Sequence, residues 1–228
     1  MTKWIFGAIL GSTLLVGAAQ ADTVTLAELL NGGTITNGDK VFGNFTYSGT
    51  GTAPLASAIT ISPWTIANSP IPDYGIRIQG LFSGTGDAGI SYTVTVVGTP
   101  YVITDATATS VGTAVGGSAA WDVAESLFTT SAPVTAIGTL STYGIVGVGT
   151  KLTDHIDFGL PGYTSIRVVK DIGFQANGGF VNLSIVDQNF SQSAVPELST
   201  WAMMLVGFAA IGFAGYRKAK TGAEISAV

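Results

Sequence analysis

The sequence predicts a mainly β protein whose body, residues 22–187, folds as an antiparallel β-sandwich or jelly roll. Glycine, threonine, serine, valine and isoleucine dominate this body and charged residues are rare, which is typical of short strands joined by tight turns. Apolar and polar residues alternate over several runs, as where Ile76 and Ile78 flank Arg77. We expect about eight to ten strands, with an N-terminal signal peptide and a single C-terminal transmembrane helix.

The first part of the body is predicted to contain one helical turn and one strand. The run Thr25-Leu26-Ala27-Glu28 matches a capping box, so a short helix is expected there. Asn37-Gly38-Asp39 predicts a turn before a strand over 40–47. Residues 48–70 are expected to be mostly loop because three prolines interrupt them, with brief pairing over 59–61.

Two hairpins are predicted in the rest of the body. The runs 74–82 and 90–97 are expected to pair around a glycine-rich turn over 83–89. A second pair of runs, 164–175 and 179–187, flanks Asn177-Gly178, which favours a tight turn. Further strands are expected at 101–111, 119–127, 132–140 and 143–148.

The N-terminus has the features of a secretory signal peptide over residues 1–21. Lys3 supplies the positive charge, and an apolar run over 4–16 follows it. Ala19-Gln20-Ala21 is an A-x-A cleavage site directly before Asp22. We therefore expect signal peptidase to cut between Ala21 and Asp22 and the mature chain to begin at Asp22.

The C-terminal region predicts a membrane anchor. The apolar run 198–216 has 19 residues, and as a helix it would span about 28 Å, close to the thickness of the hydrocarbon core. Trp201 and Tyr216 stand at its two ends, where aromatic rings favour the membrane interface. A polar linker over 188–194 is expected to precede this region.

Basic residues after the apolar run predict its orientation in the inner membrane. They are expected to remain cytoplasmic with the tail 221–228, leaving the body in the periplasm. The cluster consists of Arg217, Lys218 and Lys220.

The tail also carries a motif. It reads Val195-Pro196-Glu197, then Ser199-Thr200-Trp201-Ala202-Met203-Met204, and closes with the basic cluster. Over residues 195–220 it resembles the PEP-CTERM sorting signal of exported bacterial proteins. The resemblance implies recognition through Val195, Pro196 and Glu197 and cleavage by exosortase, a membrane-embedded processing enzyme. It also implies delivery to the cell surface or the extracellular matrix. The family's second proline is Leu198 here.

Charge and cysteine content exclude several classes of function. The body has five basic and twelve acidic side chains, a net charge of about −7, which does not attract nucleic acid or other polyanions. The chain has no cysteine, so thiolate metal sites, cysteine nucleophiles and disulfides are excluded. We expect no cofactor and no metal, and acids in the turns are expected to bond their own backbone.

Two local motifs resemble sites of chemistry. Gly84-x-Gly86-x-x-Gly89 matches a dinucleotide fingerprint, but a β-branched run follows where a helix is required, so a hairpin turn is predicted instead. His155 is the only histidine, and on a strand it shares a face with Asp157. A surface polar cluster is the simpler interpretation of this pair.

The leading hypothesis is a non-enzymatic exported β-sandwich that is sorted by its tail to the cell surface or matrix. One alternative is a carbohydrate-binding or adhesion module of the exopolysaccharide matrix, with Trp64 and Trp121 stacking on sugars. Another is a secreted glycoside hydrolase with two carboxylates. A plain tail-anchored protein is the alternative for the C-terminus. The carboxylates available to a hydrolase are Asp73, Asp87, Asp105, Asp122, Glu125, Asp154 and Asp157.

Overall fold

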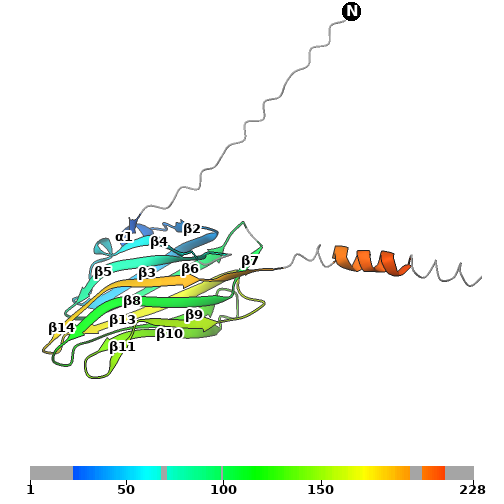
Figure 1. The fold of residues 1–228 in the computed structure, drawn as a ribbon. Coiled ribbons are helices and arrows are strands. Elements are labelled where there is room, and N and C mark those ends of the chain that lie inside the picture. Colours follow the sequence, from blue (N-terminus) through cyan, green and yellow to red (C-terminus); the bar gives the residue numbers. More distant parts are fainter. Residues whose placement is uncertain (1–22, 68–70, 99, 196–201, 214–228) are drawn as a thin grey trace, which may run out of the picture.

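The structure is a computed structural model that describes residues 23–67, 71–98, 100–195 and 202–213 (Figure 1). The predicted signal peptide lies outside these ranges, and so does most of the predicted sorting tail. The predicted site residues outside the described part are Ala19, Ala21, Asp22, Pro196, Glu197, Trp201, Tyr216, Arg217, Lys218 and Lys220.

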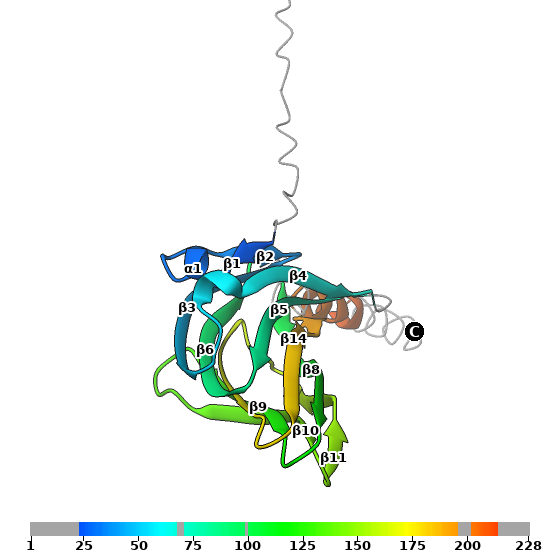
Figure 2. The ribbon, with the colours of Figure 1, turned by 90° about the vertical axis from the view of Figure 1, so that its left-hand side faces the viewer.

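The body is a sandwich of two antiparallel sheets, as predicted (Figure 2). The first sheet has the strand order β1 (Val24–Thr25), β4 (Thr60–Ile66), β5 (Asp73–Ser83), β14 (Phe180–Phe190), β8 (Asp105–Val115) and β12 (Thr153–Asp157). The second has the order β11 (Gly149–Lys151), β10 (Ala136–Ile145), β9 (Ala120–Thr129), β13 (Ser165–Gln175), β6 (Thr85–Val96), β3 (Lys40–Gly51) and β2 (Ile35–Asn37). A separate pair joins β15 (Gln192–Ala194) to β7 (Tyr101–Ile103).

The space between the sheets is filled by one apolar core. Alternate residues of each strand point inward, as expected where one face of a sheet is buried. Aromatic rings pack at its centre, with Phe45 stacked on Tyr92 at a ring-centroid separation of 5.3 Å and Phe42 6.2 Å from both Tyr92 and Phe190. Burial of this apolar surface is the main stabilising contribution to the fold.

The predicted capping box is confirmed. Helix α1 (Leu26–Leu29) begins after Thr25, whose hydroxyl accepts the Glu28 amide, while the Glu28 carboxylate accepts the Thr25 amide. Leu26 and Leu29 are buried, so the cap holds this turn against the end of the core. A second short turn, η1 (Ala56–Ala58), packs beside it.

Both predicted hairpins are wrong, because each predicted pair is divided between the two sheets. Strand β5 pairs with β4 and β14, whereas β6 pairs with β3 and β13. The chain crosses between the sheets at Gly84, whose φ is +82°, and Gly86 and Gly89 belong to β6 rather than to a turn. A second crossing from β13 to β14 uses Asn177 and Gly178, both at positive φ. Alternation of apolar and polar residues predicts which side chains are buried. Two consecutive strands show the same alternation whether they pair in one sheet or lie in the two facing sheets, so the pattern does not predict their pairing.

Two predicted loops are strands in the structure. Within 48–70, β3 continues to Gly51 and β4 includes Pro63, which lies beyond the two residues that β1 pairs. Proline is compatible with that position because, among the described residues, no strand pairs with that part of the β4 edge. The predicted linker 188–194 is also wrong, since β14 runs to Phe190, Gln188 is fully buried, and β15 follows.

Strand boundaries also differ in the middle of the chain. The predicted strands 132–140 and 143–148 both overlap the single strand β10, and β12 lies where no strand is predicted. The predicted run 101–111 is divided between β7 and β8.

The C-terminal segment leaves the body at the β15–β7 pair (Figure 1). Val195, the first residue of the predicted sorting motif, donates its amide to the carbonyl of Pro100 at 2.7 Å. Residues 202–213 are helical, and their side chains are exposed. Among the helices of the described ranges, none has the length and apolarity needed to cross a membrane. The predicted span 198–216 extends beyond the described residues at both ends.

The close packing of β5 on β14 leads to a stability prediction. A Cβ added at Gly75 would overlap the carbonyl oxygen of Gln188. We expect Gly75→Ala to lower the free energy of unfolding by about 3 kcal/mol or more, because backbone must move to relieve the overlap. Gly43→Ala is the control, since its Cβ would meet only the Thr34 methyl, at 3.1 Å. Equal losses for the two variants in urea denaturation would contradict the packing described here.

Candidate functional site

The outer surface of the six-stranded sheet carries a continuous set of polar and aromatic side chains. We call it the polar sheet face and define it by Trp64, Arg77, Thr107, Thr109, His155 and Asp187. Cross-strand register places Arg77, Asp187 and Thr109 side by side on β5, β14 and β8. The next row aligns Thr107 of β8 with His155 of β12. Because side chains alternate along a strand, these residues point away from the core that Ile76, Val186 and Ala108 enter.

The polar sheet face contains a three-residue stack. The guanidinium carbon of Arg77 lies 3.5 Å from the centroid of the Trp64 ring. The same guanidinium donates to both carboxylate oxygens of Asp187, from Nε at 2.8 Å and from Nη2 at 2.7 Å. This ion pair raises the pKa of Arg77, with the hydrogen bond to Asp187 as the largest cause. Bidentate pairing fixes the plane of the guanidinium, so the half-buried indole is held in one orientation.

Side-chain amides hold the backbone beneath Trp64. Asn37 donates to the carbonyl of Trp64 at 3.1 Å and to that of Gly75 at 2.9 Å. Asn189 donates to the same Trp64 carbonyl at 3.2 Å. The Asn37 oxygen in turn accepts the Thr65 hydroxyl at 3.0 Å. Two buried amides from different sheets therefore fix the strand that presents the indole.

The other end of the polar sheet face is built from hydroxyl groups and an imidazole. The Thr107 hydroxyl lies 2.9 Å from Nδ1 of His155, which is exposed. Asp157 is exposed two residues along β12, so the prediction that it shares a face with His155 is confirmed. Burial raises the pKa of the neighbouring Asp105, whose Oδ1 accepts the Ser191 amide at 3.2 Å. This region offers both donors and acceptors to a ligand lying across the strands.

The prediction that Trp121 stacks on a ligand is wrong. Its side chain is fully buried between the sheets, and Cβ atoms added at Gly112 or Gly144 would collide with its indole ring. One glycine on each sheet, on β8 and on β10, therefore makes room for the ring. A tryptophan that fills the core and one that presents a platform cannot be distinguished by residue type alone.

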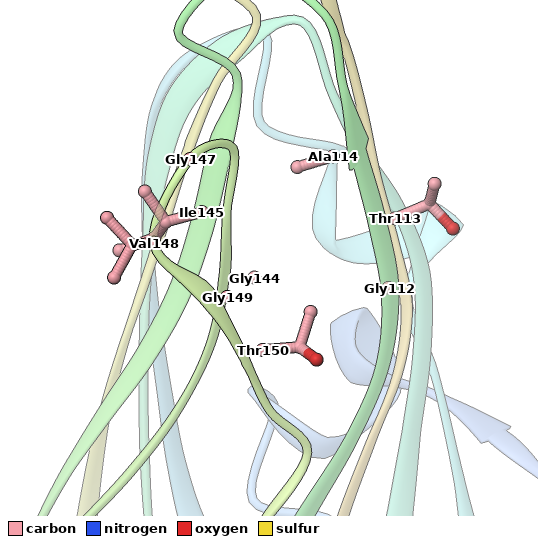
Figure 3. A pocket seen from close by; sticks show the side chains of 9 residues that line it. All are labelled: Gly112, Thr113, Ala114, Gly144, Ile145, Gly147, Val148, Gly149 and Thr150. Carbon is pink, nitrogen blue, oxygen red and sulfur yellow. The ribbon is translucent and has the colours of Figure 1, made fainter.

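A glycine-lined cleft opens beside this buried tryptophan, between β8 and the β10–β11 turn (Figure 3). Its volume is about 460 Å³. Figure 3 shows Ala114 and Thr150 pointing into the gap, while Ile145 and Val148 point away from it. No lining residue has a titratable side chain, so the cleft offers no acid or base.

A second cavity, of about 360 Å³, lies at the opposite part of the body near β7 and β15. The half-buried tyrosines Tyr74 and Tyr101 line it together with Asp39 and Gln192. Gly38, at φ +58°, packs directly against the ring of Tyr74, so that ring is covered on the side of the turn.

The structure brings together three carboxylates that concern the hydrolase hypothesis. Asp87, Asp122 and Asp171 surround Gly173 on the outer surface of the seven-stranded sheet. Burial, and then the Asp171 charge, raise the pKa of both Asp87 and Asp122. Within the described ranges, the His, Asp and Glu side chains form no group suited to hold a metal ion. The aromatic stack lies on the other sheet, so these acids and the polar sheet face do not form one site.

No family model matches the chain, and no curated protein matches it. Among solved structures, TmCBM61 in complex with beta-1,4-galactotriose has a TM-score of 0.35 and 10% identity, covering 66% of this chain and 89% of that one. The family 11 carbohydrate-binding module from Clostridium thermocellum, in complex with a mixed-linked tetrasaccharide, has a TM-score of 0.23 and 12% identity, covering 68% and 91%. The enzymatically active domain of bacteriophage CBA120 tailspike protein 4 scores 0.28 at 12% identity, covering 65% and 19%. Likeness at this level assigns neither a ligand nor a site to this chain.

The acidic cluster leads to a pH prediction. Because the folded pKa values of Asp87 and Asp122 lie above the ordinary value of 3.8, the unfolded chain loses these protons first as pH rises. The cluster therefore lowers stability at neutral pH, and this loss disappears below that ordinary value. We expect Asp171→Asn to raise the melting temperature at neutral pH by roughly 2 °C, a small effect because these groups are partly exposed to solvent.

The same comparison at acidic pH provides the control, since Asp171→Asn should then have no effect. Asp157→Asn removes one charge away from the cluster, where the carboxylate accepts the Gly159 amide, and should not raise the melting temperature at neutral pH. A stabilisation by Asp171→Asn that persists at acidic pH would contradict the electrostatic explanation.

Proposed function

We propose that this protein is a non-enzymatic, exported carbohydrate-binding module that recognises a neutral polysaccharide through its polar sheet face. The observation that carries the proposal is the stack of Trp64 on Arg77, with the guanidinium held by two hydrogen bonds to Asp187. A fixed, half-buried aromatic ring beside charged hydrogen-bonding groups is suited to a sugar, whose C–H face is apolar and whose edge carries hydroxyls.

The bound sugar would use both parts of this surface. One ring would pack on the part of the Trp64 indole that Arg77 leaves uncovered. Its hydroxyl groups would accept from the partly exposed guanidinium of Arg77, while the buried Asp187 would hold that guanidinium in place, since charged groups form the stronger hydrogen bonds. Further units of an extended chain would reach the Thr107 hydroxyl and the His155 imidazole across β14 and β8.

The charge of the body favours a neutral ligand. A net charge of about −7 over the body repels anionic polymers at long range. Arg77 is the cation of the polar sheet face, and Asp187 already pairs with it. Contacts to sugar hydroxyls depend on hydrogen-bond geometry rather than on net charge, so a neutral exopolysaccharide is the expected partner.

Export and sorting complete the proposal. Signal peptidase would remove residues 1–21, and the helix of the tail would hold the precursor in the inner membrane with its body in the periplasm. An exosortase-type enzyme would then cut near Pro196-Glu197 and release the body to the cell surface or matrix. The motif begins directly after β15, and Val195 still bonds to the body through Pro100. The enzyme would therefore act close to the folded domain rather than on a long linker.

Substitution of Trp64 tests the binding proposal. We expect Trp64→Ala to weaken binding to neutral polysaccharides on a glycan array at least tenfold, because loss of an aromatic anchor at the centre of a site typically costs about 2 kcal/mol or more. Phe180→Ala is the matched control, since this exposed aromatic residue lies at the far end of the same sheet. Loss of binding in both variants, or in neither, would remove the support for this site.

Intact-mass measurement tests the sorting proposal. Protein recovered from the surface and medium of its native host should have the mass of a chain from Asp22 to about Glu197. A mass that fits Asp22 to Val228, confined to the membrane fraction, would mean that Leu198 prevents processing and that the tail acts as a simple anchor.

A further inference from the structure

A lysine, a glutamine and a glutamate meet between the two sheets, away from the polar sheet face. Lys170 of β13 lies opposite Glu125 of β9 in the register of the seven-stranded sheet, and its amine contacts the Glu125 carboxylate. The same amine lies 2.6 Å from the side-chain oxygen of Gln188, on β14 of the facing sheet. One amine therefore contacts a carboxylate on its own sheet and an amide on the opposite sheet.

This group is isolated from solvent. Lys170 and Gln188 are fully buried, and Glu125 is 2% exposed. The Gln188 side-chain nitrogen and the second Glu125 oxygen have no hydrogen-bond partner among the described residues. A buried amide nitrogen and a buried carboxylate oxygen without partners are costly if their only role is stability. Their arrangement therefore calls for a chemical explanation.

We propose that Lys170 and Gln188 form an intramolecular isopeptide bond, with Glu125 as the residue that transfers protons. The Lys170 amine attacks the side-chain carbonyl carbon of Gln188, forming a C–N bond. The bond from that carbon to the Gln188 nitrogen breaks, and one molecule of ammonia leaves. The product is an amide that joins β13 to β14 and thus covalently connects the two sheets.

Glu125 accepts and passes on the protons that this reaction must move. The ammonium form of Lys170 gives one proton to the Glu125 carboxylate and becomes the free amine that attacks. The amine loses a second proton through the same carboxyl group to the departing nitrogen, which leaves as ammonia. One proton remains on Glu125, which loses its cationic partner in the product. Burial raises the pKa of Glu125, so the neutral acid is the favoured product form.

A second set, again a lysine, a glutamine and an acidic residue, provides an internal comparison. The Lys40 amine lies 2.5 Å from the Gln192 side-chain oxygen and 3.2 Å from Asp39. Asp39 and Gln192 line the 360 Å³ cavity, so this set borders a cavity rather than the closed core. Water near the acid would hydrate its charge and oppose proton transfer from the amine. We therefore assign the bond to Lys170 and Gln188.

A peptide map of the purified full-length chain tests the assignment. Cleavage before aspartate cuts at Asp157, Asp171 and Asp187, which places Lys170 and Gln188 on different peptides. If the bond forms, the two peptides are recovered as one cross-linked pair, whose mass is the sum of their masses less the mass of one ammonia. Recovery of both peptides separately, each at its full mass, would overturn the proposal whether or not any variant folds.

Variants then test the role of each group. Glu125→Gln retains the size of the side chain but cannot carry the proton, so we expect the two peptides to be unlinked. Lys170→Arg removes the nucleophile, so the whole protein should have the mass expected from its sequence, with no loss of ammonia. Gln192→Ala alters only the second set and should retain the loss of one ammonia. A mass loss that disappears with Gln192→Ala, or that persists in Lys170→Arg, would also overturn the assignment.

Discussion

The arrangement of the molecule depends on strand β14, because its alternating side chains serve the core and the polar sheet face at once. Its inward residue Gln188 meets Lys170 between the sheets, and its outward residue Asp187 holds Arg77. Pairing with β5 on one side and β8 on the other fixes its position at the centre of the first sheet. A shift of one residue in its register would exchange these two faces. The ordering of Trp64 therefore depends on the same constraint as the closure of the core.

Much of the fold was open to prediction from the sequence. The β class, the two-sheet sandwich, the capped turn at Thr25 and the strand alternation around Ile76 follow from local composition and period. The pairing of strands does not. Gly84 and Asn177-Gly178 carry ordinary turn signals, yet each directs the chain to the opposite sheet. Local residues encode that a turn occurs, whereas the choice of partner depends on long-range packing.

The candidate site shows the same division. The sequence predicts that Trp64 and Trp121 both bind ligand, but Trp121 instead fills the core. The sequence does not single out Arg77 and Asp187, which lie 110 positions apart and form a bidentate pair in the fold. No local pattern marks such a pair, since an arginine on an alternating strand is ordinary. The polar residues after 187 predict a linker, yet Gln188 is buried. Its burial depends on partners from other strands, which the local sequence does not reveal.

An NMR titration of the isotope-labelled body with neutral oligosaccharides tests most directly whether ligand binds on the polar sheet face. If it does, the largest changes in chemical shift will involve the Trp64 indole and the amides of β5, β14 and β8 around Arg77, Asp187 and Thr107. Changes confined to the glycine-lined cleft at Gly144, or to the tyrosine-lined cavity, would contradict it.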